Sequence, residues 1–338
     1  GPGGKKIAPS GAVSAYHRGL AVLASVRYGN PSSKMVVIGV TGTNGKSTTS
    51  NMIARVLEGA GFRVGLATTC NFRIAGKEWL NDTKMTMLGR FKLQKLLADM
   101  VKAGCEFAVV ETSSEGIAQH RHAGINYDVA VFTNLTPEHI ESHGGFENYK
   151  VAKGKLFAKL AAEPRKTLGG KPVPKTIVAN LDSPHAGYFL NFTANKKYGF
   201  AVERKPPAGG GSASGGKLVA WPIAIIKALG VELGPDGSRF TVRDVPFDLK
   251  MLGMINVENA MAAVAVGSSL GLDLHVMSRA LAAIESVPGR QERIDLGQDF
   301  TAMVDYSHEP ESFKRLYEIV ATLPKHRVIH VIGSAGGG

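Results

Sequence analysis

The chain has 338 residues, of which 44% are hydrophobic and 20% are charged, and its formal net charge at pH 7 is +12. This composition is typical of a globular protein with room for two domains, and no apolar run approaches the roughly 20 residues that span a bilayer. The basic residues are scattered rather than interleaved with aromatics, which favours attraction of anionic nucleotides and substrates, or a merely solvated basic surface, over nucleic-acid binding.

Cysteine content and the first residues indicate where the protein works. Cys70 and Cys105 lack the spacing of metal ligands, and the opening Gly-Pro-Gly-Gly-Lys-Lys is not followed by a long apolar run. These features favour a reducing cytoplasm, no disulfide framework and no secretory signal. We expect a cytoplasmic protein without a membrane span, and we expect it to be a monomer.

Strand-like and helix-like patterns alternate along the first half of the chain. A helix is expected at 11–28, ended by Gly29-Asn30-Pro31. Strands are expected at 35–40, 64–69, 106–111, 128–133 and 175–180, and helices at 46–60, 90–103 and 146–161. Such alternation predicts an α/β fold with a mostly parallel sheet flanked by helices.

The second half of the chain predicts a change of domain. Residues 203–217 are low in complexity and are expected to form a flexible excursion. An antiparallel strand pair is expected at 239–249, and helices at 256–270 and 273–285. After a turn signal at 286–289, a strand at 300–305, a helix at 311–323 and a strand at 328–332 predict the start of a Rossmann-like domain. We therefore expect a tail and helix at 1–34, a central domain at 35–286 and an incomplete C-terminal domain at 287–338.

The strongest functional signal lies between the first expected strand and the helix that follows it. Residues 40–49 read Val-Thr-Gly-Thr-Asn-Gly-Lys-Ser-Thr-Thr, a strand–turn–helix arrangement typical of a phosphate-binding loop. Backbone N–H groups and the helix dipole would cradle phosphate oxygens, with Lys46 at the β/γ phosphates and Ser47 on Mg2+. Val40 stands where the usual pattern has its first glycine, and an ordinary glycine-rich turn is the alternative interpretation.

Polar residues follow the carboxyl ends of later strands, where a parallel sheet presents groups to a ligand. Glu111 ends one strand, and Glu138 and His139 lie beyond another, so these side chains are candidates for binding Mg2+. Lys153 lies on the next expected helix, four residues after Tyr149. A helix cap or ion pair is the alternative for Glu111, and a solvated side chain is the alternative for Lys153.

Taken in order, these segments resemble the successive motifs of the Mur ligase family over residues 35–338. The matching motifs are Thr41-Gly-Thr-Asn-Gly-Lys-Ser-Thr48, Glu111-Thr-Ser-Ser114, Thr133-Asn-Leu-Thr-Pro-Glu-His139, Tyr149-Lys-Val-Ala-Lys-Gly-Lys-Leu-Phe157, Gly253-Met-Ile-Asn-Val-Glu-Asn259, Val287-Pro-Gly-Arg290 and Asp305-Tyr-Ser-His-Glu-Pro310. Gln119-His-Arg121 and Tyr306-Ser-His308 most resemble the branch that adds the third residue of the muramoyl peptide.

The resemblance implies an ATP-dependent amide ligase of peptidoglycan precursor synthesis. ATP would convert a carboxylate of a muramoyl-peptide acceptor into an acyl phosphate, which the amine of an amino acid would attack. Catalysis would rest on positioning and electrostatics, with Lys46, Glu111, His139 and Lys153 as catalytic residues.

The resemblance also assigns ligands to residues of this sequence. The ATP-binding residues would be Gly42, Thr43, Asn44, Gly45, Lys46, Ser47, Thr48, Asn256, Asn259, Arg290, Asp305, Tyr306 and His308. Two Mg2+ ions would be held by Ser47, Glu111, His139 and Lys153, and the acceptor by Thr86, Ser113, Gln119 and Arg121. Lys153 would be carbamylated by CO2, or would remain unmodified and pair with phosphate. For Asn256, a helix N-cap is an equally acceptable role.

Several departures from the family pattern keep other functions open. Met87, Leu88 and Glu115 replace the usual Thr, Pro and His. Only residues 1–34 precede the central domain, where family members have a UDP-binding domain of roughly a hundred residues. A UDP-free, lipid-linked or folylpolyglutamate-like acceptor is therefore one alternative. A non-catalytic ATP-binding module and a generic P-loop NTPase are others. Because Arg290 and Lys46 must share one ATP, we also expect the last two domains to rotate about 287–290.

Overall fold

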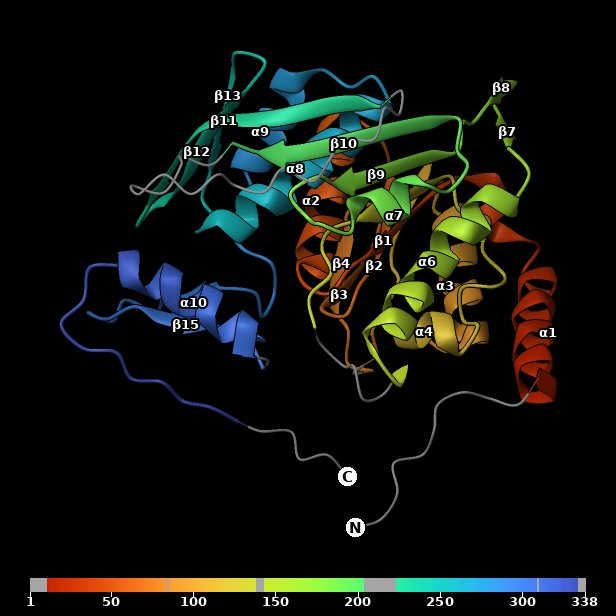
Figure 1. Cartoon of the computed structure of the whole chain (residues 1–338), viewed down its shortest axis with the longest axis horizontal. Coiled ribbons are helices and arrows are strands. Elements are labelled where there is room, and N and C mark those ends of the chain that lie inside the picture. Colours follow the sequence, from red (N-terminus) through yellow and green to blue (C-terminus); the bar gives the residue numbers. More distant parts are fainter. Residues whose placement is uncertain (1–10, 84, 138–142, 204–222, 309, 334–338) are drawn as a thin grey trace, which may run out of the picture.

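The fold is that of a computed structural model, which describes residues 11–83, 85–137, 143–203, 223–308 and 310–333 (Figure 1). Its centre is an 11-stranded sheet with the order β13-β12-β11-β10-β9-β6-β1-β5-β2-β3-β4. The strands are β1 Val36–Thr41, β2 Val64–Ala67, β3 Asn71–Ile74, β4 Lys77–Leu80, β5 Phe107–Glu111, β6 Val129–Phe132, β9 Thr176–Asn180, β10 Lys196–Val202, β11 Ala224–Gly234, β12 Gly237–Val242 and β13 Val245–Leu249.

The middle of the sheet is parallel, as predicted, and both ends are antiparallel. Strands β2, β5, β1, β6, β9, β10 and β11 run parallel, whereas β3 and β4 extend one edge and β12 and β13 the other as antiparallel strands. In the register of β1, Val40 pairs with Glu111 of β5 on one side and with Val131 of β6 on the other. The carboxyl ends of these strands therefore meet at one edge of the sheet, where the candidate site lies.

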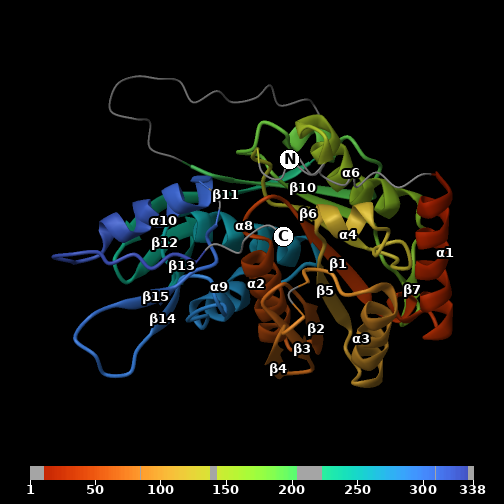
Figure 2. The ribbon, with the colours of Figure 1, turned by 90° about the horizontal axis from the view of Figure 1, so that it is seen from below.

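Helices cover both faces of the sheet and bury two hydrophobic clusters. Helices α2 Lys46–Gly59, α8 Met254–Ser269 and α9 Leu274–Ala282 contribute to one cluster, and α3 Arg90–Lys102, α4 Ser114–Ala118, α6 Phe146–Ala162 and α7 Ala186–Leu190 to the other. Alternation along β1 sends Ile38 into the first cluster and Val37 into the second, because successive strand side chains point to opposite faces. Helix α1 Gly11–Arg27 packs against α3 at the edge of the molecule (Figure 2).

A buried charged cluster ties together the strand ends opposite the candidate site. Asp128 is fully buried, accepts a hydrogen bond from the backbone N–H of Val37 (2.9 Å), and pairs with the Nζ atoms of Lys166 (2.5 Å) and Lys175 (3.3 Å). Ion pairs with the two lysines offset the cost of burying the Asp128 carboxylate, which would be high for an unpaired charge. The cluster thus fixes the start of β1 against the segment that leads into β6.

The C-terminal segment differs from the expected β-α-β unit. Strands β14 Glu292–Ile294 and β15 Ala302–Val304 form a separate antiparallel pair, followed by α10 Pro310–Thr322 (Figure 1). The strand expected at 328–332 is wrong: these residues form no strand, and Val331 is 89% exposed. A strand needs a neighbour for its backbone groups, and the described residues offer none beside this segment.

Other expectations have mixed outcomes. The expected helices at 11–28, 256–270 and 273–285 and the strand pair at 239–249 are confirmed as α1, α8, α9 and β12–β13. The sequence interpretation missed the β3–β4 hairpin, β10, β11, α4, α7, the short 3-10 helix Pro31–Lys34 and the small pair β7 Thr167–Leu168 and β8 Lys171–Pro172. Apart from Glu203, the excursion expected at 203–217 lies outside the described residues, and the division into three domains stays a prediction. No helix among the described residues is long and apolar enough to cross a membrane.

Candidate active site

The turn between β1 and α2 has the backbone geometry of a phosphate-binding loop. Gly45 is the N-cap of α2 at a φ of 78°, and a Cβ atom there would lie 2.2 Å from Oδ1 of Asn259. Only glycine fits this position, because an L side chain would be both strained and in collision. Because Gly45 has no side chain, no N-cap side chain occupies the N–H groups in the first turn of α2. Such a helix start can bind an anion.

A second segment, which follows β6, holds the loop in place. Asn134 accepts hydrogen bonds from the backbone N–H of Thr43 (through its carbonyl oxygen, 2.9 Å) and of Asn44 (through Oδ1, 2.8 Å). The hydroxyl of Thr133 donates to the carbonyl oxygen of Asn44 (2.8 Å). The motif expected at 133–139 thus begins by supporting the loop, whereas Glu138 and His139 lie outside the described residues.

The structure places Glu111 beside Ser47, and both residues were expected to bind Mg2+. Glu111 is 2% exposed, and its Oε2 accepts hydrogen bonds from Ser47 Oγ and from the backbone N–H of Thr69, both at 2.8 Å. The Thr69 hydroxyl donates to Oε1 (3.0 Å), and its oxygen lies within hydrogen-bond distance of the Thr86 hydroxyl (3.0 Å). A buried carboxylate beside a hydroxyl is a set of hard oxygen donors, which fits Mg2+. Within the described ranges no group of three or more His, Cys, Asp or Glu side chains forms a metal site.

Two lysines reach the carbonyl groups of the loop. Lys46 Nζ donates to the carbonyl oxygen of Thr43, and Lys153 Nζ donates to that of Gly42, both at 2.7 Å. Lys153 is only 1% exposed and lies 4.2 Å from the centroid of the Tyr149 ring. The solvated alternative for Lys153 is therefore wrong, and both lysines concentrate positive charge where phosphates would bind.

Residues from the C-terminal part lie beside the start of α2 and complete this side of the site. Arg290 Nη2 lies 3.5 Å from Ser47 Oγ, and its guanidinium stacks 4.6 Å from the Tyr306 ring centroid. Asp305 accepts hydrogen bonds from the backbone N–H groups of Gln291 (2.9 Å) and Ser307 (2.8 Å). The structure thus brings Arg290 to Ser47, whereas the domain rotation about 287–290 stays a prediction.

The start of α8 forms the wall next to these residues. Asn259 accepts a hydrogen bond from the Thr49 hydroxyl through Oδ1 (3.1 Å), and Asn256 donates to Oε1 of Gln291 (3.0 Å). The N-cap of α8 is Gly253, so the alternative role of Asn256 as that cap is wrong. Asn256 instead joins α8 to the segment that carries Arg290.

Residues at the other end of the site were predicted to bind the acceptor. The hydroxyl of Ser113 caps α4 by accepting from the backbone N–H of Gly116 (3.2 Å). Arg121 donates to Oε1 of Gln119 (2.6 Å) and to the carbonyl oxygen of Met87. Burial lowers the pKa of Arg121, and the nearby Arg90 lowers it further. Gln119 orients Arg121 rather than facing the cavity itself.

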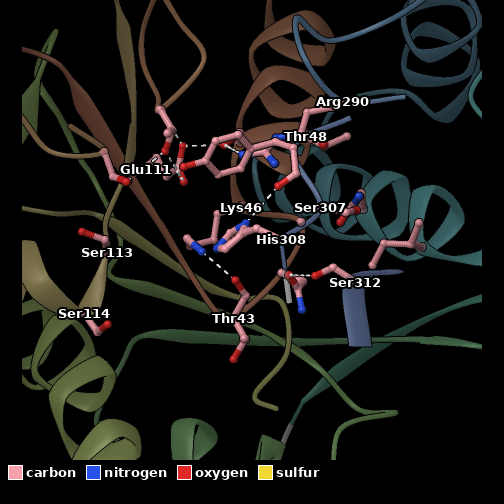
Figure 3. Close-up of a pocket in the computed structure, with 18 of the residues that line it drawn as sticks. Thr43, Lys46, Thr48, Glu111, Ser113, Ser114, Arg290, Ser307, His308 and Ser312 are labelled. Carbon is pink, nitrogen blue, oxygen red and sulfur yellow. Dashed lines mark hydrogen bonds between the residues drawn. The ribbon is translucent and has the colours of Figure 1, made fainter. Parts of the chain in front are cut away.

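Most of these groups surround one cavity of about 410 Å3. Figure 3 shows Lys46, Glu111, Arg290 and His308, from four separate chain segments, around the same space. Of the predicted site residues that the structure describes, all but Gly42 and Gln119 line it, namely Thr43, Asn44, Gly45, Lys46, Ser47, Thr48, Thr86, Glu111, Ser113, Arg121, Lys153, Asn256, Asn259, Arg290, Asp305, Tyr306 and His308.

The cavity also has lining residues that sequence reasoning missed. They include Thr69, Met85, Ser114, Gln291, Ser307, Ser312, Arg315 and Leu316. Thr69 follows the carboxyl end of β2, so the strand-end rule could have found it. Nothing in the sequence signals the residues of α10, because an amphipathic surface helix is the ordinary interpretation of their spacing.

The chain resembles known proteins over most of its length. The family described as the Mur ligase middle domain matches residues 40–267. A UDP-N-acetylmuramyl-tripeptide synthetase of Roseiflexus sp. (strain RS-1) is 38% identical over 329 residues, which cover 94% of this chain and 60% of that protein. A UDP-N-acetylmuramoyl-L-alanyl-D-glutamate–2,6-diaminopimelate ligase of Geobacillus thermodenitrificans (strain NG80-2) is 35% identical over 325 residues, with coverages of 94% and 61%. The chain thus spans about three fifths of the length of these relatives.

Solved structures agree with this similarity. A UDP-N-acetylmuramoyl-L-alanyl-D-glutamate–2,6-diaminopimelate ligase superposes with a TM-score of 0.63 at 27% identity, over 86% of this chain and 54% of the other. A Mycobacterium tuberculosis folylpolyglutamate synthase superposes with a TM-score of 0.64 at 18% identity, over 90% and 70% of the two chains. At that identity the second comparison shows the fold alone.

Proposed function

The chain belongs to the Mur ligase family, whose middle domain it matches over residues 40–267, and we propose that it acts as an ATP-dependent amide ligase. The acceptor would be a muramoyl peptide and the donor an amino acid, in peptidoglycan precursor synthesis. Support comes from relatives named as tripeptide synthetases and diaminopimelate ligases that are at least 35% identical over 94% of this chain. The observation that carries the proposal is one cavity lined by Lys46, Ser47, Glu111 and Arg290.

The proposed reaction has two steps. A carboxylate oxygen of the acceptor attacks the γ-phosphorus of ATP, the bond to the β-phosphate oxygen breaks, and ADP leaves. The amine of the amino acid then attacks the carbonyl carbon of the acyl phosphate, phosphate leaves with the electrons of the C–O bond, and the nitrogen loses a proton. Phosphorylation is required because an unactivated carboxylate has a poor leaving group.

The residues around the loop suit the first step. Lys46 and Arg290 would neutralise the charge that spreads over the phosphoryl oxygens during transfer. Glu111 and Ser47 would hold Mg2+, which supplies further charge neutralisation when it is bound. Two Mg2+ ions, with His139 as a further ligand, remain part of the proposal by resemblance to the family.

Lys153 would carry a carbamate in this function. Its neutral amine would add to CO2 with loss of a proton, which turns a buried cation into an anionic oxygen ligand for a metal. The almost complete burial of Lys153 beside the loop supports a role at the metal rather than in solvent. Mass spectrometry of the native protein under CO2 tests this: a mass increase of one CO2 that Lys153→Ala abolishes is expected, and no increase would contradict it.

A phosphate-release screen tests the whole proposal. Muramoyl dipeptides with and without UDP are crossed against candidate amino acids, with Lys46→Ala as the inactive control. Release that requires both an acceptor and an amine supports a ligase, and the UDP arms identify the acceptor. Release with ATP and Mg2+ alone would indicate a generic NTPase. ATP binding without any substrate-dependent release would indicate a binding module. We further propose that the protein is a monomer and that it acts in the cytoplasm, where ATP is supplied.

A further inference from the structure

Helix α10 forms part of the nucleotide cavity, although it lies far along the chain from the phosphate loop. Ser312, Arg315 and Leu316 line the cavity, and Ile319 lies on the same face of the helix because it follows at the i+7 position. This face therefore has two parts: its first turns face the nucleotide side of the cavity, and its later turns face α8.

The later turns fix α10 against the start of α8. Ile319 is only 4% exposed, and a Cβ atom at Gly253 would lie 2.5 Å from its Cγ1 atom. Gly253 has a φ of 82°, so glycine is favoured there for its backbone as well as for the space it leaves. Arg315 lies 3.8 Å from the carboxylate of Glu258 on α8. An apolar side chain in a glycine notch and one ion pair thus set where α10 sits.

The first turn of α10 contacts the phosphate loop itself. The hydroxyl of Ser312 donates a hydrogen bond to Oδ1 of Asn44 (3.2 Å), across 268 positions of sequence (Figure 3). The backbone of Asn44 is already fixed from the other side, because its N–H and carbonyl groups are bonded to Asn134 and Thr133. Asn44 directly precedes Gly45, the N-cap of α2. Its backbone is therefore held by the segment that follows β6 and its side chain by α10.

We propose that Ser312 is a positioning residue, which acts through Asn44 to hold the phosphate loop in the conformation that binds the β-phosphate. Docking of Ile319 into the Gly253 notch places Ser312 within reach of Asn44. Tight binding of a nucleoside di- or triphosphate then requires α10 to be docked, whereas binding of a nucleoside monophosphate does not. This inference rests on the proposed function, since it takes ATP as the ligand of the loop.

Calorimetry of the full chain with ATP, ADP and AMP tests the inference. For Ser312→Ala we expect the affinity for ATP and ADP to fall about 2- to 13-fold, the usual range for one neutral hydrogen bond, with AMP affinity unchanged. Ser312→Thr keeps a hydroxyl and restores the affinity. Ser278→Ala is the matched control. Ser278 lies in α9, outside the cavity lining, and its hydroxyl donates to the carbonyl oxygen of Pro246 in β13 (2.6 Å).

Two double-mutant cycles test the route of the effect. In an Asn44→Ala background, Ser312→Ala is expected to cause no further loss of ADP affinity, because its partner is gone. In an Ile319→Ala background it is also expected to add little, because α10 is no longer docked. Additive losses in either cycle, or an equal loss of AMP affinity, would overturn the inference. Unchanged ADP affinity in Ser312→Ala would do the same, whereas a wild-type chain that binds no ATP would instead reject the proposed function.

Discussion

The contact between Glu111 and Ser47 gives the sharpest test of the candidate active site. Glu111→Gln keeps the size and shape of the side chain and removes its negative charge. In the structure, Oε2 accepts from Ser47 Oγ and from the backbone N–H of Thr69, both at 2.8 Å, and Oε1 accepts from the Thr69 hydroxyl. An amide can keep its carbonyl oxygen at the Oε2 position, and the Thr69 hydroxyl can then turn to accept from the new NH2 group.

This geometry separates the effect on the fold from the effect on catalysis. The three hydrogen bonds can survive as neutral ones, so we expect the free energy of unfolding to fall by about 1–3 kcal/mol. The lost charge is the one that would face Mg2+. One charge-assisted contact is worth about 1.5–3 kcal/mol, which corresponds to a fall of about 10- to 150-fold in kcat/KM for Mg-ATP.

The assay measures phosphate release at increasing Mg2+ concentration, together with the affinity for ATP in the absence of Mg2+. We expect the rate to fall and the required Mg2+ concentration to rise, with little change in metal-free ATP binding. Glu285→Gln is the matched control, because Glu285 is exposed and pairs with Lys250 outside the cavity lining. An unchanged rate at every Mg2+ concentration would refute the role of Glu111 at the metal.

Three further substitutions test the loop, the pH dependence and the buried charges. Gly45→Ala should weaken ATP binding by more than about tenfold, because its Cβ atom would lie 2.2 Å from Oδ1 of Asn259. Gly61→Ala is the control, since Gly61 also has a positive φ (90°) but no atom lies near its Cβ position, and equal ATP affinities of the two variants in calorimetry would contradict the prediction. Burial lowers the pKa of His122 to about 3, so as the pH falls below about 6.5 the unfolded chain binds a proton that the folded chain does not. The free energy of unfolding should then fall by up to about 1.4 kcal/mol per pH unit, and denaturation of His122→Leu should lack this pH dependence. Asp128→Asn leaves its two lysine partners buried without their counter-charge, so unfolding by denaturant should show a loss of about 3–5 kcal/mol, and a loss below about 1 kcal/mol would be inconsistent with that arrangement.

Elements with strong local patterns were predictable from the sequence. The helix after the phosphate loop, the apolar strand that ends at Glu111 and the parallel sheet all follow from periodicity and from the alternation of elements. The hairpin β3–β4 was missed because its strands, Asn-Phe-Arg-Ile and Lys-Glu-Trp-Leu, contain polar residues and lack the apolar runs that indicated the equally short strands β2 and β6. The strand expected at 328–332 shows the opposite error, since an apolar run becomes a strand only where a neighbour pairs with it.

The sequence by itself determined the chemistry of the loop, because the glycine at the α2 N-cap, Lys46 and Ser47 are adjacent residues whose roles follow from local backbone geometry. Tertiary structure alone decided which distant groups meet them. Glu111 reaches Ser47 across 64 positions, Arg290 reaches it across 243, and Ser312 reaches Asn44 across 268. Such contacts depend on strand order and on how helices pack, and these are set by the burial of the whole chain rather than by any short segment.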